Sequence, residues 1–278
     1  MRVQVKAQTR RKGFIDVNEL NAYQVAYGKP LSYKDYLQYV GLPAIVMAGL
    51  AFALWYNIWV SIICAIIGLI YGFKSIMPKS IKRKYNMLSL QARKIFINNM
   101  TQILTDDSKT INKAISIAKD RTKGELKEDI NLLETKIHGA NKFQISEAFS
   151  ELKDKYENDV VFTQYLEQLE TAMFEGKNNI STLKQIKSYH NDMVTKTNEY
   201  MRFKDGSVRD MKQLSLFVVI FIIAITFSFG FDTYYEGFAK SIVGWIFGGI
   251  YYILMIRHSL KFFSFYFDDE IMSLGVSK

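Results

Sequence analysis

The chain has 278 residues and a formal net charge of +9, from 36 Lys and Arg residues against 27 Asp and Glu residues. About half of its residues are hydrophobic, and they gather in long uncharged runs that alternate with charge-rich stretches. This division argues against an ordinary soluble protein and predicts a membrane protein with a soluble insert. The single cysteine, Cys64, excludes an internal disulfide.

Three uncharged runs are candidates for crossing a bilayer, because a helix needs roughly 20 apolar residues to span the hydrocarbon core. They are residues 42–73, 213–231 and 241–256. The first run is too long for one ordinary crossing and short for two. Asn57, which has aromatic residues on both sides, offers a turn at its middle. We interpret residues 33–77 as a transmembrane hairpin, and one long tilted helix is the alternative.

The distribution of positive residues predicts the orientation of these helices. Lys and Arg collect on the cytoplasmic side of a membrane, most strongly near the ends of the crossing segments. Their numbers are 7 in residues 1–41, 25 in 74–212, 1 in 232–240 and 3 in 257–278. If the chain crosses the membrane four times, all the basic regions lie on the same side. We therefore expect these regions and both termini to lie in the cytoplasm of a bacterial cell. Basic residues beside an anionic membrane account for the net charge, so no nucleic-acid partner is expected.

In chain order, the sequence divides into six predicted segments. They are a basic N-terminal cytoplasmic segment (1–32), the transmembrane hairpin (33–77), a basic linker (78–88), a helical cytoplasmic domain (89–212), two further transmembrane helices (213–257) and a cytoplasmic tail (258–278).

Residues 89–212 carry apolar side chains at steps of three and four, the pattern of amphipathic helices. Turn and capping residues divide the region into six helices. The breaks fall at 105–108, near 124, at 138–141, at 158–159 and at 175–176. No segment alternates for long like a strand. The predicted fold is therefore all-α, with a six-helix bundle inserted between two membrane hairpins.

The sixth of these helices begins near Ile180 and can continue into the third transmembrane segment. His190 lies on its apolar seam and is interpreted as a packing residue. Asp205 and Gly206 interrupt the apolar pattern just before the membrane. They are interpreted either as a hinge that passes movement to the membrane or as a simple kink.

The apolar runs contain no Asp, Glu, Lys, Arg or His. Ion-coupled transporters commonly place ionisable groups at membrane depth, so this composition argues against a transporter. Small residues four apart do occur, as at Gly68 and Gly72 and at Gly244 and Gly248. Such pairs let helix backbones approach closely in lipid, and they predict tight helix packing within or between chains.

No pattern in the chain indicates a reaction. The histidines, at 138, 190 and 258, are far apart and have no cysteine pair beside them, so no metal site is expected. Phosphate-binding glycine loops are absent. Adjacent carboxylates, as at 106–107 and 268–269, fall where a cap or a solvated surface is the common role. We therefore predict no catalytic residue, no cofactor and no enzyme.

This order of segments, over about residues 88–257, resembles the type II secretion F domain family, in particular its TadB/TadC-like platform proteins. Residues 143–149 (FQISEAF) are similar to a family segment of Gly-x-x-Leu-x-x-Ala-Leu type, and residues 103–115 to a family turn into a helix. The clearest local similarity is a helix-breaking turn of Gly-Glu-x-x-Gly-x-Leu-x-x-x-Leu type. Its residues here are Glu175, Gly176, Asn179 and Leu183, with asparagine in place of the second glycine.

The resemblance implies an inner-membrane platform of a Tad pilus, type IV pilus or type II protein secretion machine. It further implies three kinds of partner: a cytoplasmic assembly ATPase, pilin or pseudopilin subunits, and a second copy or a paralogue of the platform. Membrane lipid is the remaining expected partner. Two alternatives stay open at this point: a structural component of a conjugation or DNA-uptake complex, and, as the weakest, a transporter.

Overall fold

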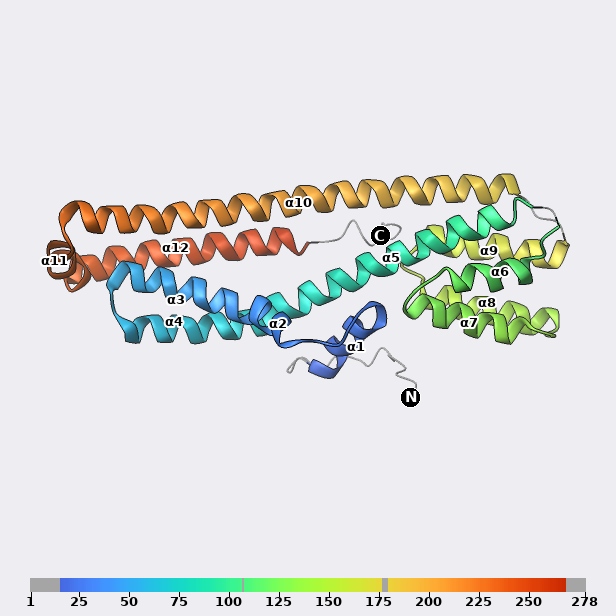
Figure 1. Cartoon of the computed structure of the whole chain (residues 1–278), viewed down its shortest axis with the longest axis horizontal. Coiled ribbons are helices and arrows are strands. Elements are labelled where there is room, and N and C mark those ends of the chain that lie inside the picture. Colours follow the sequence, from blue (N-terminus) through green and yellow to red (C-terminus); the bar gives the residue numbers. More distant parts are fainter. Residues whose placement is uncertain (1–15, 107, 177–179, 269–278) are drawn as a thin grey trace. The chain divides into compact units, whose positions relative to one another are not determined.

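The computed structural model describes residues 16–106, 108–176 and 180–268 (Figure 1). Within these ranges the chain forms helices joined by short turns, and no strand occurs. The described residues divide into two compact units. We call residues 16–22, 30–83 and 202–268 the membrane unit, and residues 23–29 and 84–201 the bundle unit. The predicted all-α fold class is confirmed for the described residues.

The membrane unit contains the apolar helices, which follow one another with few interruptions. They are α2 (Tyr33–Tyr36), the π-helical turn η1 (Leu37–Gly41), α3 (Leu42–Trp55), α4 (Ile58–Tyr71), the π-helical turn η2 (Gly72–Ile76), the start of α5 (Met77–Ile103), the end of α10 (Ile180–Phe229), α11 (Phe231–Tyr234), the π-helical turn η3 (Tyr235–Ala239) and α12 (Ile242–Tyr266). Four continuous helical stretches are long and apolar enough to cross a membrane. The predicted number of four crossing helices is thus confirmed by length and composition.

A tight turn at residues 56–57 separates the first two crossings. Tyr56 adopts a left-handed backbone with φ of +49°. The side chain of Asn57 caps α4 and accepts a hydrogen bond from the Trp59 N–H at 3.0 Å. Cap and turn satisfy backbone groups that would otherwise lack partners where the two helices end and begin. Residues 42–71 therefore form two helices joined by a turn and not a single long helix, and that both cross the membrane stays a prediction.

Close approach between α3 and α4 depends on Gly68. A Cβ atom added at this position would lie 2.6 Å from the Ala44 Cα atom, closer than any ordinary contact. Gly72 lies equally close to the backbone of η1, with an added Cβ 2.7 Å from the Tyr39 carbonyl oxygen. Backbones meet here because glycine leaves no side chain between them. The small residues thus pack helices within the chain.

The bundle unit is built from amphipathic helices around one apolar core. Besides parts of α5 and α10 it contains the end of α1 (Val17–Tyr27), α6 (Ile111–Asp120), α7 (Glu125–Ile137), α8 (Lys142–Lys155) and α9 (Val160–Glu175). All of them except α1 contribute buried side chains to one cluster, for example Phe96 from α5, Leu126 from α7 and Phe149 from α8, and Tyr27 of α1 packs against that cluster as a partly buried residue. Thr110, Asn141 and Asp159 cap α6, α8 and α9 at their N-termini. These helices lie where the apolar periodicity predicts them.

One predicted non-helical segment is helical instead. Residues 78–88, predicted to be a basic linker, belong to α5. The π-helical turn directly before Pro78 is the kind of local adjustment that lets a helix continue past a proline. In the predicted tail, residues 258–266 complete α12. The predicted N-terminal segment includes α1, while residues 1–15 lie outside the described residues.

The chain stays helical at Asp205 and Gly206, because α10 passes through both residues as one helix of 50 residues. A single glycine costs a helix only about 1 kcal/mol relative to alanine, which is too little to end a helix of this length. An added Cβ at Gly206 would meet nothing within 4 Å, so no close packing explains this glycine. A role as a hinge stays a hypothesis.

The backbone contact at Gly68 predicts a large effect for a small substitution. Gly68→Ala should lower the free energy of unfolding by about 1–3 kcal/mol, because the new methyl group forces α3 and α4 apart. Gly49→Ala is the matched control, since a Cβ at Gly49 meets nothing within 4 Å. Thermal unfolding midpoints of the full-length protein in detergent should fall for the first variant only. Equal midpoints for both variants would contradict the contact.

Candidate functional site

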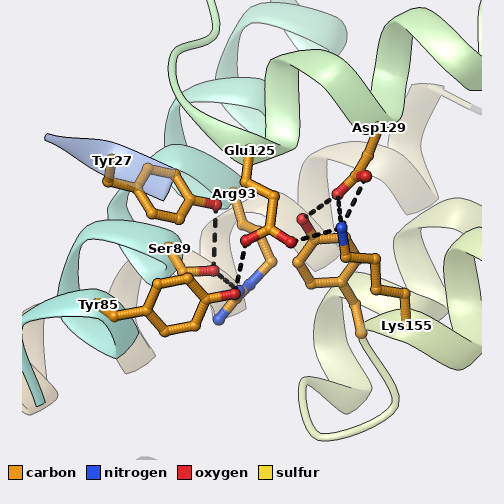
Figure 2. A network of polar contacts seen from close by, with 8 residues as sticks. Tyr27, Tyr85, Ser89, Arg93, Glu125, Asp129 and Lys155 are labelled. Carbon is orange, nitrogen blue, oxygen red and sulfur yellow. Dashed lines mark hydrogen bonds and ion pairs between the residues drawn. The ribbon is translucent and has the colours of Figure 1, made fainter. Parts of the chain in front are cut away.

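A network of polar side chains connects the helices of the bundle unit (Figure 2). On its α1 and α5 side, the Tyr27 hydroxyl donates a hydrogen bond to the Ser89 Oγ atom at 3.3 Å. The Arg93 Nη1 atom donates to the same Ser89 oxygen at 2.6 Å. One turn earlier in α5, the Tyr85 hydroxyl donates to the Glu125 Oε2 atom at 2.7 Å. Three side chains of one face of α5 are therefore tied to α1 and α7.

The network continues from α7 to the end of α8 through Lys155. Its Nζ atom lies 2.6 Å from the Glu125 Oε1 atom and 2.7 Å from both carboxylate oxygens of Asp129. The neighbouring Tyr156 hydroxyl donates to the Asp129 Oδ2 atom at 2.7 Å. The ammonium group balances the two carboxylates only in part, and the two tyrosine hydroxyls stabilise them further.

Burial and nearby carboxylates fix the protonation of the network's tyrosines. The pKa of Tyr85 is raised, chiefly by burial and then by its hydrogen bond to Glu125. The pKa of Tyr156 is raised for the same first reason and by the charge of Asp129. Burial alone would lower the pKa of Lys155, but Asp129 and Glu125 outweigh it and raise that pKa. Both tyrosines therefore stay hydroxyl donors and the lysine stays a cation at physiological pH.

Gly124 lets Tyr27 reach this network. The glycine has φ of +66° at the start of α7, a conformation that side chains rarely adopt. A Cβ at this position would lie 2.3 Å from the Tyr27 Cδ1 atom and 2.6 Å from the Ala26 carbonyl oxygen. The sequence shows Gly124 only as a helix boundary. Its contact with residues almost a hundred positions earlier has no signal in the sequence.

A second buried group of charges lies where α5, α9 and α10 meet. The Arg93 Nε atom is 2.6 Å from the Asp159 Oδ2 atom, and both side chains are largely buried. Asp159 also caps α9, accepting a hydrogen bond from the Phe162 N–H at 3.0 Å. The His190 Nε2 atom lies 3.6 Å from the same carboxylate. Burial alone would raise the pKa of Asp159, but His190 and Arg93 outweigh it and lower that pKa to about 2.

His190 is fully buried, and within the described residues neither of its ring nitrogens has a hydrogen-bond partner. At 3.6 Å its contact with Asp159 is too long for a hydrogen bond. The position on the apolar seam of α10 is the one predicted from the sequence. Its acidic neighbour is not, because residues 159 and 190 belong to different helices.

A third group of contacts joins helices inside the membrane unit, beside the end of α12. The Lys204 ammonium of α10 donates a hydrogen bond to the Asp268 carbonyl oxygen, and the Arg83 guanidinium stacks on the Tyr266 ring, 4.0 Å from its centroid. The Tyr266 hydroxyl donates to the Asp205 Oδ1 atom at 3.2 Å. Cations beside carbonyls at a helix C-terminus are favourable because of the helix dipole. The aromatic residues after 261 are thus packed against α5 and α10.

Among the described residues no group of three His, Cys, Asp or Glu side chains could hold a metal ion. A hollow of about 300 Å³ beside α6 and α7 is lined by residues that include Lys113, Glu134 and His138. Its carboxylate, Glu134, is already paired with Lys119 at 2.6 Å. A hydrogen bond from Lys119, together with its charge, outweighs burial and lowers the pKa of Glu134.

The residues of the predicted helix-breaking turn lie in different parts of the bundle unit. Glu175 ends α9, and Gly176 closes it with φ of +64°, donating its N–H to the Ala172 carbonyl oxygen at 3.1 Å. Leu183 is buried in the core of the bundle unit, and Asn179 lies outside the described residues. This turn is a helix C-cap of the expected chemistry. Asp205 and Gly206 belong to the membrane unit, whereas this turn belongs to the bundle unit.

Two of the predicted packing glycines lie in α12. A Cβ at Gly248 would lie 2.9 Å from the Trp55 indole nitrogen, at the end of α3. At Gly244 it would overlap the Phe238 carbonyl oxygen, at a distance of 1.9 Å. Both positions therefore need glycine for a contact inside the membrane unit. Assembly with other chains through these residues stays a prediction.

Comparison with known proteins gives one close relative. A protein of Bacillus anthracis that bears the name uncharacterized protein pXO2-23 is 46% identical over 268 residues, which cover 96% of this chain and 97% of the relative. The chain belongs to the pXO2-23 family. No family model matches the chain, and no solved structure matches it. The resemblance of this pXO2-23 family member to the type II secretion F domain family therefore rests on segment order and short motifs alone.

The buried Asp159 predicts an acid-dependent loss of stability. Because its pKa of about 2 is below the ordinary value of about 3.9, its contribution is present above that ordinary value and is lost as the pH falls toward 2. Asp159→Asn keeps a capping side chain but removes the charge. It should lower the free energy of unfolding by about 2 kcal/mol at neutral pH and flatten the loss between pH 5 and 3.

Asp154→Asn, at an exposed position of α8, is the control and should change stability by less than about 0.5 kcal/mol. Denaturant unfolding of the full-length protein, followed by circular dichroism at several pH values, measures both variants. An Asp159→Asn protein with the same pH profile as the unaltered protein would refute the buried ion pair.

Proposed function

We propose that this protein is a non-enzymatic platform of the cytoplasmic membrane of a bacterium, which couples a cytoplasmic assembly ATPase to the building of a pilus or pseudopilus. The observation that carries the proposal is the unbroken course of α10. This helix supplies residues 180–201 to the bundle unit and 202–229 to the membrane unit. A continuous helix is a rigid element along its length, so a displacement at one end is passed to the other.

α10 is held in the bundle unit by buried side chains and by hydrogen bonds. Leu183, His190 and Val194 are buried, and Thr197 is almost fully buried as well. The Asn191 side chain exchanges hydrogen bonds with Asn98 of α5 at 2.9 and 3.2 Å. A force on the bundle unit would therefore move α10 without slippage. The same reasoning applies to α5, which continues from α4 through η2 as one helical stretch of 46 residues.

Charge placement supports a cytoplasmic bundle unit and cytoplasmic termini. In the connection between α10 and α12, residues 230–241 carry Asp232, Glu236 and Lys240. The other ends of the four crossing stretches carry many Lys and Arg residues, as does the bundle unit. Positive residues favour the cytoplasmic side, which puts the bundle unit where a cytoplasmic ATPase can reach it.

The polar network suits a domain that bears load. Its salt bridges and hydrogen bonds join α1, α5, α7 and α8, and the pair of Arg93 and Asp159 adds α9. Buried polar groups with satisfied partners hold helices in one arrangement, because sliding would leave charges unpaired. A platform needs a domain that keeps its helices in one arrangement under force. The proposal includes no catalytic residue and no cofactor.

The proposal is tested by separating ATPase binding from the transmission of movement. The full-length tagged protein should co-purify from its host with a hexameric ATPase and with a second platform chain. Insertion of Gly-Ser-Gly-Ser after Gly206 makes α10 flexible but leaves the side chains of both units unchanged. This variant should still bind the ATPase, while the amount of pilin subunit outside the cell falls at least about tenfold, since about 1.4 kcal/mol of lost coupling corresponds to tenfold.

The same insertion after Gly139 is the matched control, because that exposed turn between α7 and α8 lies outside α10 and has open space around the glycine. It should leave both ATPase binding and pilin export unchanged. Absence of any co-purified ATPase would refute the proposal. Recovery of a relaxase or a coupling protein in its place would favour a conjugation complex instead.

A further inference from the structure

Six exposed cations form a group around one end of the membrane unit, two on each of three helical segments. We call this group the cationic ring; it consists of Lys74 and Lys79, Arg209 and Lys212, and Arg257 and Lys261. Every member lies within six residues of an apolar run. At 1.5 Å per helical residue, each α-carbon is within about 9 Å of the apolar boundary along the helix axis.

Tertiary contacts bring the three segments to the same level. The rings of Tyr71, just before Lys74, and of Phe263, just after Lys261, are 6.5 Å apart between centroids. Asp205 receives a hydrogen bond from Tyr266 at 3.2 Å, which joins α10 to α12. Lys79 itself lies 5.8 Å from the centroid of the Phe267 ring. The ring is therefore a feature of the folded membrane unit and not of any one segment.

The six cations of the ring are not paired with acidic side chains among the described residues. Within the described residues none of them has an ion pair or a hydrogen bond through its side chain, and all six are exposed. The acids near this end are few, and one of them, Asp205, is already in contact with Arg83 at 3.9 Å. At the opposite end, Lys240 is paired with Glu236 at 2.6 Å. Within the described residues, this end of the membrane unit thus presents six cations that have no ion-pair partner.

We propose that the cationic ring binds the headgroups of anionic phospholipids. The occupant is a lipid because the cations directly follow or precede exposed apolar side chains, such as Ile70, Leu216 and Leu254, which face the surroundings of the helices. A molecule that satisfies both features has acyl chains beside those side chains and a negative charge at their end. Lys and Arg at this height attract anionic lipid with a free energy of about 1 kcal/mol each.

Anionic phospholipid occupying the ring would also hold α5, α10 and α12 together from outside. This role is independent of the platform function, because it requires no ATPase and no pilin. It assigns the six cations a ligand, whereas the positive-inside rule assigns them only a side of the membrane.

The test measures thermal unfolding of the full-length protein in mild detergent, with added phosphatidylglycerol or phosphatidylcholine of identical acyl chains. Phosphatidylglycerol should raise the unfolding midpoint in a concentration-dependent way, by linkage to the folded state, and high salt should weaken the effect. The variant Lys74→Gln, Arg209→Gln, Lys261→Gln removes one cation from each segment. Its apparent affinity for phosphatidylglycerol should fall at least about tenfold.

Two further variants keep the result decisive. Lys127→Gln, Lys184→Gln, Lys196→Gln removes the same charge from exposed positions of the bundle unit and should keep the full response. Lys74→Arg, Arg209→Lys, Lys261→Arg keeps the ring's charge and should also bind. Equal responses to the two lipids, or an equal loss of affinity in the bundle-unit variant, would overturn the proposal. Displacement of phosphatidylglycerol by a DNA duplex would assign the ring to nucleic acid and overturn it as well.

Discussion

The constraint on which the structure depends is that backbone N–H and C=O groups in a bilayer must find partners within the chain. Helices meet this requirement, because their backbone groups bond to one another. At two of the helix starts in the membrane unit, a capping side chain accepts a hydrogen bond from a backbone N–H group that lacks a partner within the helix. Asn57 caps the turn between α3 and α4, and Ser241 caps α12 by accepting a hydrogen bond from the Gly244 N–H at 3.0 Å. The π-helical turn before Pro78 keeps α5 continuous with α4.

Outside the apolar runs, water can satisfy the backbone, and specificity has to come from side chains. The bundle unit combines an apolar core with buried polar contacts that are saturated by their neighbours. Apolar contacts tolerate sliding, whereas the pair of Arg93 and Asp159 does not, because an unpaired buried charge is costly. Gly124 serves the same end, since it permits the one approach of Tyr27 to α7. Such a unit keeps its form under load, as the proposed platform requires.

Charge has a different task in each unit. In the bundle unit, cations such as Lys155 form ion pairs with carboxylates of the same unit. In the membrane unit, the members of the cationic ring are left exposed at the edge of the apolar helices. The two units thus use the same residue types for internal order and for an external ligand. The 46% identity to the pXO2-23 relative covers nearly the full length of both chains, and that similarity by itself carries no function.

The sequence by itself determined the helices, the four crossings and the turn at Asn57, because apolar periodicity, run length and capping residues are local properties. It failed at residues 78–88, where neighbouring helix on both sides outweighs the local breaker Pro78. Tertiary structure alone decided the partners of Tyr27, Asp159 and His190, since these lie on separate helices and each contact joins residues far apart in the chain. It also decided that six scattered cations form one ring, because the packing of three helices, and not their spacing in sequence, sets the height of each.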